Sequence, residues 1–377
     1  MLTWTSAALL FFSAGATAHY LRTAARRPRL VYQANARSAA LVARLPRLSR
    51  RFWPTPWLFN GHLQIAGLCL REALAAPLHY DRVDSLRMAD GGTTELHWLG
   101  LDLPADTPTL VVLHTIMGTA QSMRAFVRDL QRMTGWRIVL CQRRGHGALR
   151  LTSPKFNTMG DVDDLRHQLR VIAETLPRSP LYAAGVSAGT GLMIRYLGEQ
   201  GDDTPIRAAF AFCPGYDISV AFGRSKAPYT RIMAKRLVEQ FIAPNRDALQ
   251  HLASLGALET AQSLEAFQRH LYECAGYASQ QDYLAACNPV GVMQRVSVPL
   301  LVLNAEDDPV CVAKNVEEHL DAMRQLPNAV LAVTSRGSHC AYLAGLGARP
   351  WAHQLAAEFL LAAHAAPGSG TSLAPHG

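Results

Sequence analysis

The segment Gly185–Gly189, Gly-Val-Ser-Ala-Gly, constrains the fold of this chain more than any other feature. An apolar run, 181–184, precedes it, and a run with helical spacing, 192–197, follows it. A serine between two glycines at a strand-to-helix turn forms a nucleophile elbow, in which the hydroxyl projects from the sheet edge. Cβ atoms in place of the glycines would collide where strand and helix approach closely. We therefore expect Ser187 to be a nucleophile; the alternative is an ordinary glycine-rich loop.

A serine hydroxyl needs a base to take its proton and an acid to orient that base. Two later strand-like runs end in suitable groups: 299–304 leads to Asp307 and Asp308, and 329–333 leads to His339. The carboxyl ends of parallel strands meet at one sheet edge, where α/β proteins bind ligands. We expect His339 to be the base. Asp308 is preferred over Asp307 as the acid because it directly precedes the proline of its turn.

An oxyanion hole requires two backbone N–H groups. One is expected from Ala188, the residue after the nucleophile. The other is expected from the loop after the strand-like run 109–114, with Ile116 as the first choice and Thr115 as the second. His114, at the end of that run, is interpreted as a loop-packing residue.

The order Ser, Asp, His and the alternation of strands and helices predict an α/β-hydrolase fold, with a mostly parallel sheet and helices on both faces. We expect the hydrolase domain over residues 76–365, an inserted helical cap over about 216–295, and a disordered tail over 366–377. The apolar cap residues either line an acyl pocket or pack the cap onto the sheet. They are Ile232, Met233, Leu237, Phe241, Leu271, Tyr272, Tyr277 and Tyr283.

The formal net charge of +8 comes from the N-terminal region. Residues 1–71 hold ten arginines and no carboxylate, which leaves a net charge of −2 for the rest of the chain, so we expect no nucleic-acid partner. Residues 1–20 are uncharged and apolar, and a basic linker and arm, 21–75, follows. This pattern predicts a single-pass membrane anchor. A cleaved secretory signal and a mitochondrial presequence are the alternatives.

The seven cysteines form no Cys-x-x-Cys pair, and their number is odd, so neither a disulfide framework nor a zinc site is indicated. We expect no metal and no organic cofactor. Cys340, beside His339, is either reactive or a small packing residue. A His-x-x-x-x-Asp acyltransferase pattern at His97 and Asp102 lies in a strand-like region and is interpreted as chance.

The segment Pro-Trp-Leu-Phe-Asn-Gly-His-Leu-Gln at 56–64 resembles a signature of a membrane-associated branch of α/β-hydrolases. That branch includes medium-chain fatty-acid ethyl ester synthase/esterases and monoacylglycerol and phospholipid hydrolases. Arg144-Gly145 with 151–154, and the acid turn 303–309, resemble further family segments, and the resemblance covers about 50–360. It implies a triad formed by Ser187, Asp308 and His339, and it agrees with an N-terminal membrane segment. For Asn60-Gly61-His62 the default is a structural turn near the sheet.

Four positions depart from the family pattern. Thr115, Ser338 and Ala341 stand where glycines are usual, and Gly191 stands where asparagine is common. None of these departures removes a member of the triad.

The sequence therefore predicts a serine carboxylic-ester hydrolase acting on lipid-like acyl esters, of short to medium chain or monoacylglycerol type. The acyl-enzyme would be resolved by water or by an alcohol. A non-catalytic ligand-binding protein of the same fold and an amidase or peptidase are the alternatives. Acyl length, head group and oligomeric state stay open at this stage.

Overall fold

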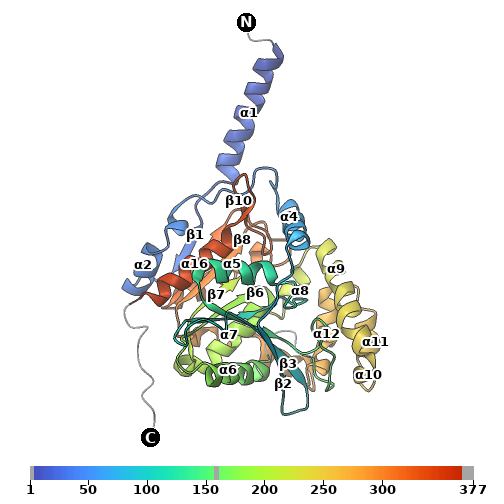
Figure 1. The fold of residues 1–377 in the computed structure, drawn as a ribbon. Coiled ribbons are helices and arrows are strands. Elements are labelled where there is room, and N and C mark those ends of the chain that lie inside the picture. The colour runs from blue at the N-terminus through green and yellow to red at the C-terminus, as the bar shows by residue number, and fades with distance from the viewer. Residues whose placement is uncertain (1–3, 157–160, 367–377) are drawn as a thin grey trace.

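A nine-stranded sheet lies at the centre of the computed structural model, which describes residues 4–156 and 161–366 (Figure 1). The strand order is β1-β9-β8-β7-β6-β4-β5-β3-β2; the pairs from β5 through β4, β6, β7 and β8 to β9 are parallel. The expected mostly parallel sheet is thus confirmed. The strands are β1 (Arg29–Tyr32), β2 (Arg82–Arg87), β3 (Thr93–Leu99), β4 (Thr109–Leu113), β5 (Arg137–Gln142), β6 (Leu181–Val186), β7 (Ile206–Phe212), β8 (Leu300–Ala305) and β9 (Ala329–Thr334), with a separate small hairpin of β10 (Leu343–Ala344) and β11 (Arg349–Pro350).

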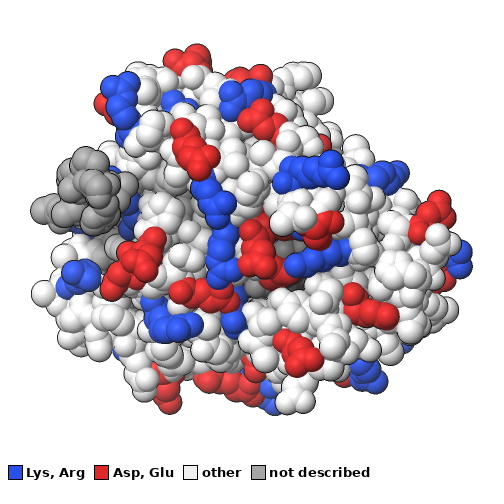
Figure 2. Space-filling model, turned by 90° about the horizontal axis from the view of Figure 1, so that it is seen from below, with Lys and Arg blue, Asp and Glu red and all other residues white. Residues whose placement is uncertain are grey.

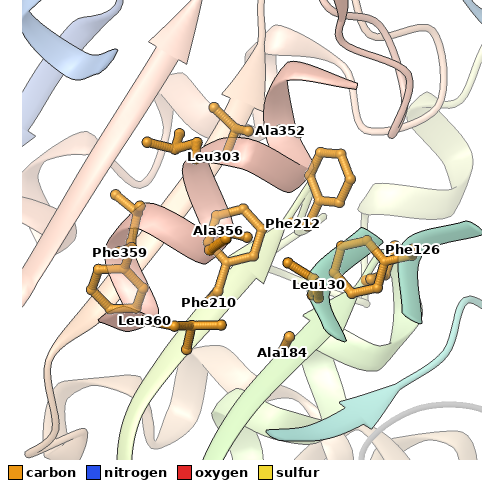
Figure 3. Close-up of a cluster of buried hydrophobic side chains, with 14 of the residues drawn as sticks. Phe126, Leu130, Ala184, Phe210, Phe212, Leu303, Ala352, Ala356, Phe359 and Leu360 are labelled. Carbon is orange, nitrogen blue, oxygen red and sulfur yellow. The ribbon is translucent and has the colours of Figure 1, made fainter. Parts of the chain in front are cut away.

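Helices cover both faces of the sheet, and this explains why the central strands are continuous apolar runs. Every residue of β4, β5, β6, β8 and β9 is buried, as expected for parallel strands between two helical layers. On one face, Phe126 of α5 (Arg124–Thr134) and Phe359 of α16 (Trp351–His364) pack around Phe210 and Phe212 of β7 (Figure 3). On the other face lie α6 (Asp163–Thr175) and α7 (Ala188–Gln200).

The N-terminal arm is part of the sheet. β1 pairs antiparallel with β9, from Arg29 opposite Val333 to Tyr32 opposite Val330. Three helices follow it: α2 (Ala36–Ala43), α3 (Pro46–Ser49) and α4 (Gly61–Leu74). Part of the region expected as a basic linker and N-terminal arm, 21–75, therefore closes one edge of the sheet.

A group of short helices lies between β7 and β8, in the region expected as the cap. Their buried apolar side chains form a cluster of their own. The helix that ends at Leu237 continues as a π-helical turn over Val238–Ile242, and two short helices follow within 246–259. The helices are α8 (Ala221–Arg224), α9 (Ala227–Leu237), α10 (Arg246–Leu249), α11 (Leu255–Glu259), α12 (Leu264–Cys274) and α13 (Gln280–Cys287), and after β8 come α14 (Ala313–Glu317) and α15 (Leu320–Gln325).

Helix α1 (Trp4–Thr23) projects from the end of the molecule where β10 lies (Figure 1). Within residues 4–156 and 161–366, no helix combines the length and the apolar character needed to cross a bilayer. The expectation of a spanning anchor therefore gains no support from α1. Nearly all of the tail expected to be disordered, from residue 367 on, lies outside the described residues.

Candidate active site

Ser187 occupies a strained turn between β6 and α7. Its φ is 53° and its ψ is −117°, a conformation that costs a non-glycine residue about 1–3 kcal/mol. Both flanking glycines are required by close packing. A Cβ on Gly185 would lie 2.6 Å from the carbonyl oxygen of Gly189, and one on Gly189 would lie 2.2 Å from that of Leu113. The elbow therefore holds the serine at the carboxyl edge of the sheet.

The structure brings Ser187, His339 and Asp308 into one hydrogen-bonded chain. The hydroxyl of Ser187 lies 2.9 Å from Nε2 of His339. Nδ1 of His339 lies 2.8 Å from Oδ2 of Asp308. These distances and this order are what a base and its orienting acid need in order to activate a serine.

The two neighbouring aspartates have different roles in this geometry. The carboxylate of Asp308 is buried, and its second oxygen accepts two backbone N–H groups of the turn that follows it. Asp307 instead accepts the N–H of Ser338 at 2.8 Å, and burial raises the pKa of its carboxyl. Asp308 therefore holds the imidazole, whereas Asp307 holds the backbone that carries it.

The electrostatics of the pair suit a general base. Burial by itself would lower the pKa of His339, but the charge of Asp308 and its hydrogen bond outweigh burial and raise this pKa well above its usual value. The charge of Asp308 thus favours the imidazolium form of His339.

Of the two candidate oxyanion donors in the loop after β4, Ile116 has the better position. Ile116 lines the same cavity as Ser187 and Ala188. Thr115 does not line it. Ala188 opens α7, where the first backbone N–H groups of a helix have no partner within the helix.

A buried polar network behind this loop fixes its shape. Nε2 of His146 lies 3.0 Å from the carbonyl oxygen of Ile116, and the guanidinium of Arg143 contacts the carbonyl oxygens of His114 and Thr115. Burial and the charge of Arg143 lower the pKa of His114 and bring that of His146 to about 3. Both imidazoles are therefore neutral, and His114 has the expected packing environment. Thr115 has no positive φ, so its backbone does not need glycine.

Three cysteines surround the imidazole of His339. Sγ of Cys213 accepts the backbone N–H of Cys340 at 3.3 Å, and burial raises the pKa of Cys340 well above its usual value and that of Cys311 to about 11. The atoms that could bind a metal ion lie within 4.8 Å of one another in two groups of side chains, Cys213–His339–Cys340 and Asp308–Cys311–His339. Burial therefore favours the protonated thiol of Cys340, which agrees with its interpretation as a small packing residue.

A deep apolar cavity opens beside Ser187. It encloses about 900 Å³ of space free of protein atoms, part of it open to solvent, and none of its lining residues is charged. Leu300 and Val302 of β8 line it, together with Val310 and Cys311 in the segment that follows the strand. Residues of α7, including Gly191 and Ile194, form the opposite wall.

The residues that line the cavity differ from the cap residues that the sequence suggested as its lining. Among the eight apolar cap residues considered above, only Met233 lines it. Leu237, Phe241 and Leu271 belong to the buried cluster inside the cap, and Ile232 is 53% exposed. For most of them the packing interpretation therefore holds.

The Asn60-Gly61-His62 segment links the acid turn to the cap. Asn60 caps α4 by accepting the N–H of Leu63, and a Cβ on Gly61 would lie 2.5 Å from the carbonyl oxygen of Asp307. His62 stacks on Tyr229 of α9, with Nδ1 at 2.7 Å from the phenol oxygen. Its contact with the cap could not be read from the sequence, because the partner lies 167 residues away.

The His-x-x-x-x-Asp pattern of His97 and Asp102 does not form a site. His97 lies within β3, and its Nε2 is 2.9 Å from Glu95 on the same strand. Asp102 is exposed beyond the end of that strand. This geometry agrees with a chance match.

Comparisons with known proteins agree with this architecture. The family model Hydrolase_4, described as serine aminopeptidase S33, matches residues 105–342. Phospholipase ABHD3 of Homo sapiens is 26% identical over 355 residues, covering 90% of this chain and 85% of that protein. Monoacylglycerol lipase ABHD2 of Mus musculus is 24% identical over 366 residues, covering 88% of this chain and 84% of that protein. The Pyrococcus furiosus esterase Pf2001 superposes with a TM-score of 0.50 at 17% identity, covers 75% of this chain and 91% of its own, and shows the same fold. The family resemblance drawn from the sequence is confirmed.

Proposed function

Because the chain belongs to the Hydrolase_4 family of α/β-hydrolases, we propose that this serine hydrolase cleaves carboxylic esters with Ser187 as its nucleophile. The observation that carries the proposal is the hydrogen-bonded chain from Ser187 through His339 to Asp308, at 2.9 and 2.8 Å, beside a deep apolar cavity.

In the proposed reaction, Oγ of Ser187 attacks the ester carbonyl carbon while its proton passes to Nε2 of His339. Asp308 keeps Nδ1 protonated and stabilises the imidazolium. The N–H groups of Ala188 and Ile116 bind the oxyanion, and each such donor contributes roughly 2.7–4 kcal/mol of transition-state stabilisation. The leaving alcohol takes the proton from His339, and water or a second alcohol then releases the acyl group.

The cavity supports an acyl ester as the substrate. An apolar cavity that begins beside Ser187 supports a substrate whose acyl chain lies in the cavity and whose ester carbonyl lies at the nucleophile. We therefore propose lipid-like esters, of short to medium chain or monoacylglycerol type. Their head group would remain outside the cavity.

The family description favours an amidase or peptidase as the second candidate. An aminopeptidase binds a free ammonium group, which requires a carboxylate or several acceptors near the nucleophile. Among the residues that the structure describes, no charged side chain lines the cavity, so an ester is the better fit.

A matched pair of substrates tests this choice. We expect p-nitrophenyl octanoate to be hydrolysed and octanoyl p-nitroanilide to be hydrolysed far more slowly, with both activities lost in Ser187→Ala. Ser225→Ala is the control, because Ser225 lines the same cavity but its hydroxyl donates to the carbonyl oxygen of Val310. Equal hydrolysis of the two compounds would favour the peptidase. No turnover together with no fluorophosphonate labelling would favour a ligand-binding protein.

We also propose that the N-terminal region attaches the enzyme to a membrane. The support is the apolar, uncharged sequence of residues 1–20 followed by arginines. A secreted and a mitochondrial protein are the alternatives. Carbonate extraction of cell membranes tests the proposal, since release of the protein into the soluble fraction would contradict it.

A further inference from the structure

Exposed apolar side chains gather at the end of the molecule from which α1 projects. Eleven large apolar side chains are exposed among the described residues, and seven of them lie on α1, α4, the segment between α3 and α4, or the turn between β10 and β11. We call these seven the N-terminal apolar surface. They are Leu21, Trp53, Trp57, Phe59, Leu70, Leu74 and Leu346.

Hydrogen bonds join these elements into one continuous surface. The N–H of Gly345, in the β10–β11 turn, donates to the carbonyl oxygen of Trp53, and the N–H of Thr55 donates to that of Leu343. The ring of Tyr20 on α1 lies 6.2 Å from that of Trp53. Figure 1 accordingly shows the base of α1, β10 and α4 at the same end of the molecule.

The exposed side chains are large and solvent-facing. Phe59 is 64% exposed, Leu70 60%, Leu74 77% and Leu346 76%. Leu70 and Leu74 are four residues apart on α4, so they share one face of the helix. A monomeric soluble protein rarely leaves such a cluster uncovered, and clusters of this kind mark an interaction site.

The charges around the surface indicate the partner. Arg22, Arg26, Arg27 and Arg50 are exposed beside it, and residues 13–71 and 341–357 contain no acidic residue. Figure 2 shows the opposite end of the molecule, where acidic and basic side chains are interspersed. Arginines beside exposed tryptophans and leucines suit the boundary of an anionic lipid bilayer, where phosphates meet acyl chains.

We propose that the N-terminal apolar surface docks the folded body of the protein onto an anionic membrane. Trp53, Trp57 and Phe59 enter the head-group region, the leucines of α4 reach the acyl boundary, and the arginines bind lipid phosphates. This contact is additional to any attachment by α1 and does not depend on the hydrolase activity. Because the first residues of α4 pack against the acid turn at Asp307, docking places the triad near the bilayer surface.

Tryptophan fluorescence separates docking of the body from attachment by α1. The full-length Trp4→Phe variant keeps two exposed tryptophans, Trp53 and Trp57, while the other three are buried. Vesicles of anionic phospholipid with brominated acyl chains quench only nearby tryptophans. We expect clear quenching in Trp4→Phe and its loss when Trp53 and Trp57 are also changed to Phe.

A second measurement tests the leucines and Phe59. We expect the triple variant Phe59→Ser, Leu70→Ser, Leu74→Ser to bind anionic vesicles at least about tenfold more weakly than the wild type. The control carries serine at Val83 and Ile232, which are exposed elsewhere, and should bind like the wild type; both variants should keep the wild-type melting temperature.

Three results would overturn the proposal. The first is binding to vesicles without quenching of Trp53 and Trp57, which would show that only α1 touches the lipid. The second is equal binding of the triple variant and its control. The third is a concentration-dependent blue shift of these tryptophans without lipid, which would show that a second copy of the chain covers the surface.

Discussion

Replacing Gly191 with leucine should shorten the apolar cavity beside Ser187, the channel proposed to hold the acyl chain, without harming the fold. Gly191 lines the cavity from α7, and a Cβ at this position would meet nothing within 4 Å. Its φ is not positive, so leucine can adopt the backbone conformation. Leucine also favours the helix by roughly 1 kcal/mol over glycine. The added side chain therefore enters the channel and should leave the protein at least as stable.

The size of the effect follows from the position of Gly191 along the channel. It lies one helical turn beyond Ser187, about 6 Å along α7, so Gly191→Leu leaves room only for the first carbons of an acyl chain. Each buried methylene contributes about 0.8 kcal/mol. The four methylenes that separate octanoate from butyrate are then worth about 3 kcal/mol, or roughly a 200-fold preference in kcat/KM.

The assay compares kcat/KM for p-nitrophenyl butyrate, octanoate and laurate. We expect Gly191→Leu to hydrolyse butyrate like the wild type and to lose most of the preference for the longer chains. Gly256→Leu is the matched control, because a Cβ on this glycine of α11 also meets nothing within 4 Å and it does not line the cavity. If Gly191→Leu kept the wild-type ratio of octanoate to butyrate, the acyl chain would not follow this channel.

Three further predictions concern the triad and its supports. Activity should fall as the pH drops through the pKa of His339, which lies well above its usual value; in Asp308→Asn this fall should move to lower pH, because the charge that raises the pKa of His339 is lost, and kcat should drop about 10⁴-fold. A pH–rate profile of both proteins measures the two effects. Arg144→Met should lower the free energy of unfolding by about 3–5 kcal/mol, measured by urea unfolding. The reason is that the buried carboxylate of Asp164 loses the guanidinium group that donates a hydrogen bond to each of its oxygens. Ser338→Gly should raise the free energy of unfolding by about 1 kcal/mol, because Ser338 has a φ of 56°, and a lower melting temperature would contradict this.

The elements near the site could be predicted because their signals are local. Ser187, Asp308 and His339 each follow an apolar strand directly, and the carboxyl ends of parallel strands meet at one edge. The regular alternation of strands and helices along the sequence also allowed the mostly parallel sheet to be predicted. No such local signal exists for β1, which has four residues and pairs with a strand about 300 residues later.

The apolar cavity beside Ser187 could not be predicted for a different physical reason. A cavity depends on where side chains are missing, and the sequence pattern shows only where they are apolar. The cap residues looked suitable, yet Phe241 and Leu271 fill their own cluster. The space beside β8 exists in part because Gly191 leaves it open, and this is visible only once α7 and β8 are placed against each other.

Trapping the acyl-enzyme tests the central claim most directly. The wild type is mixed with p-nitrophenyl octanoate, quenched in acid within the first turnovers, digested and sequenced by tandem mass spectrometry. We predict an octanoyl ester on Ser187, absent from Ser187→Ala. Steady hydrolysis with the acyl group on another residue, or with full activity retained in Ser187→Ala, would contradict the account.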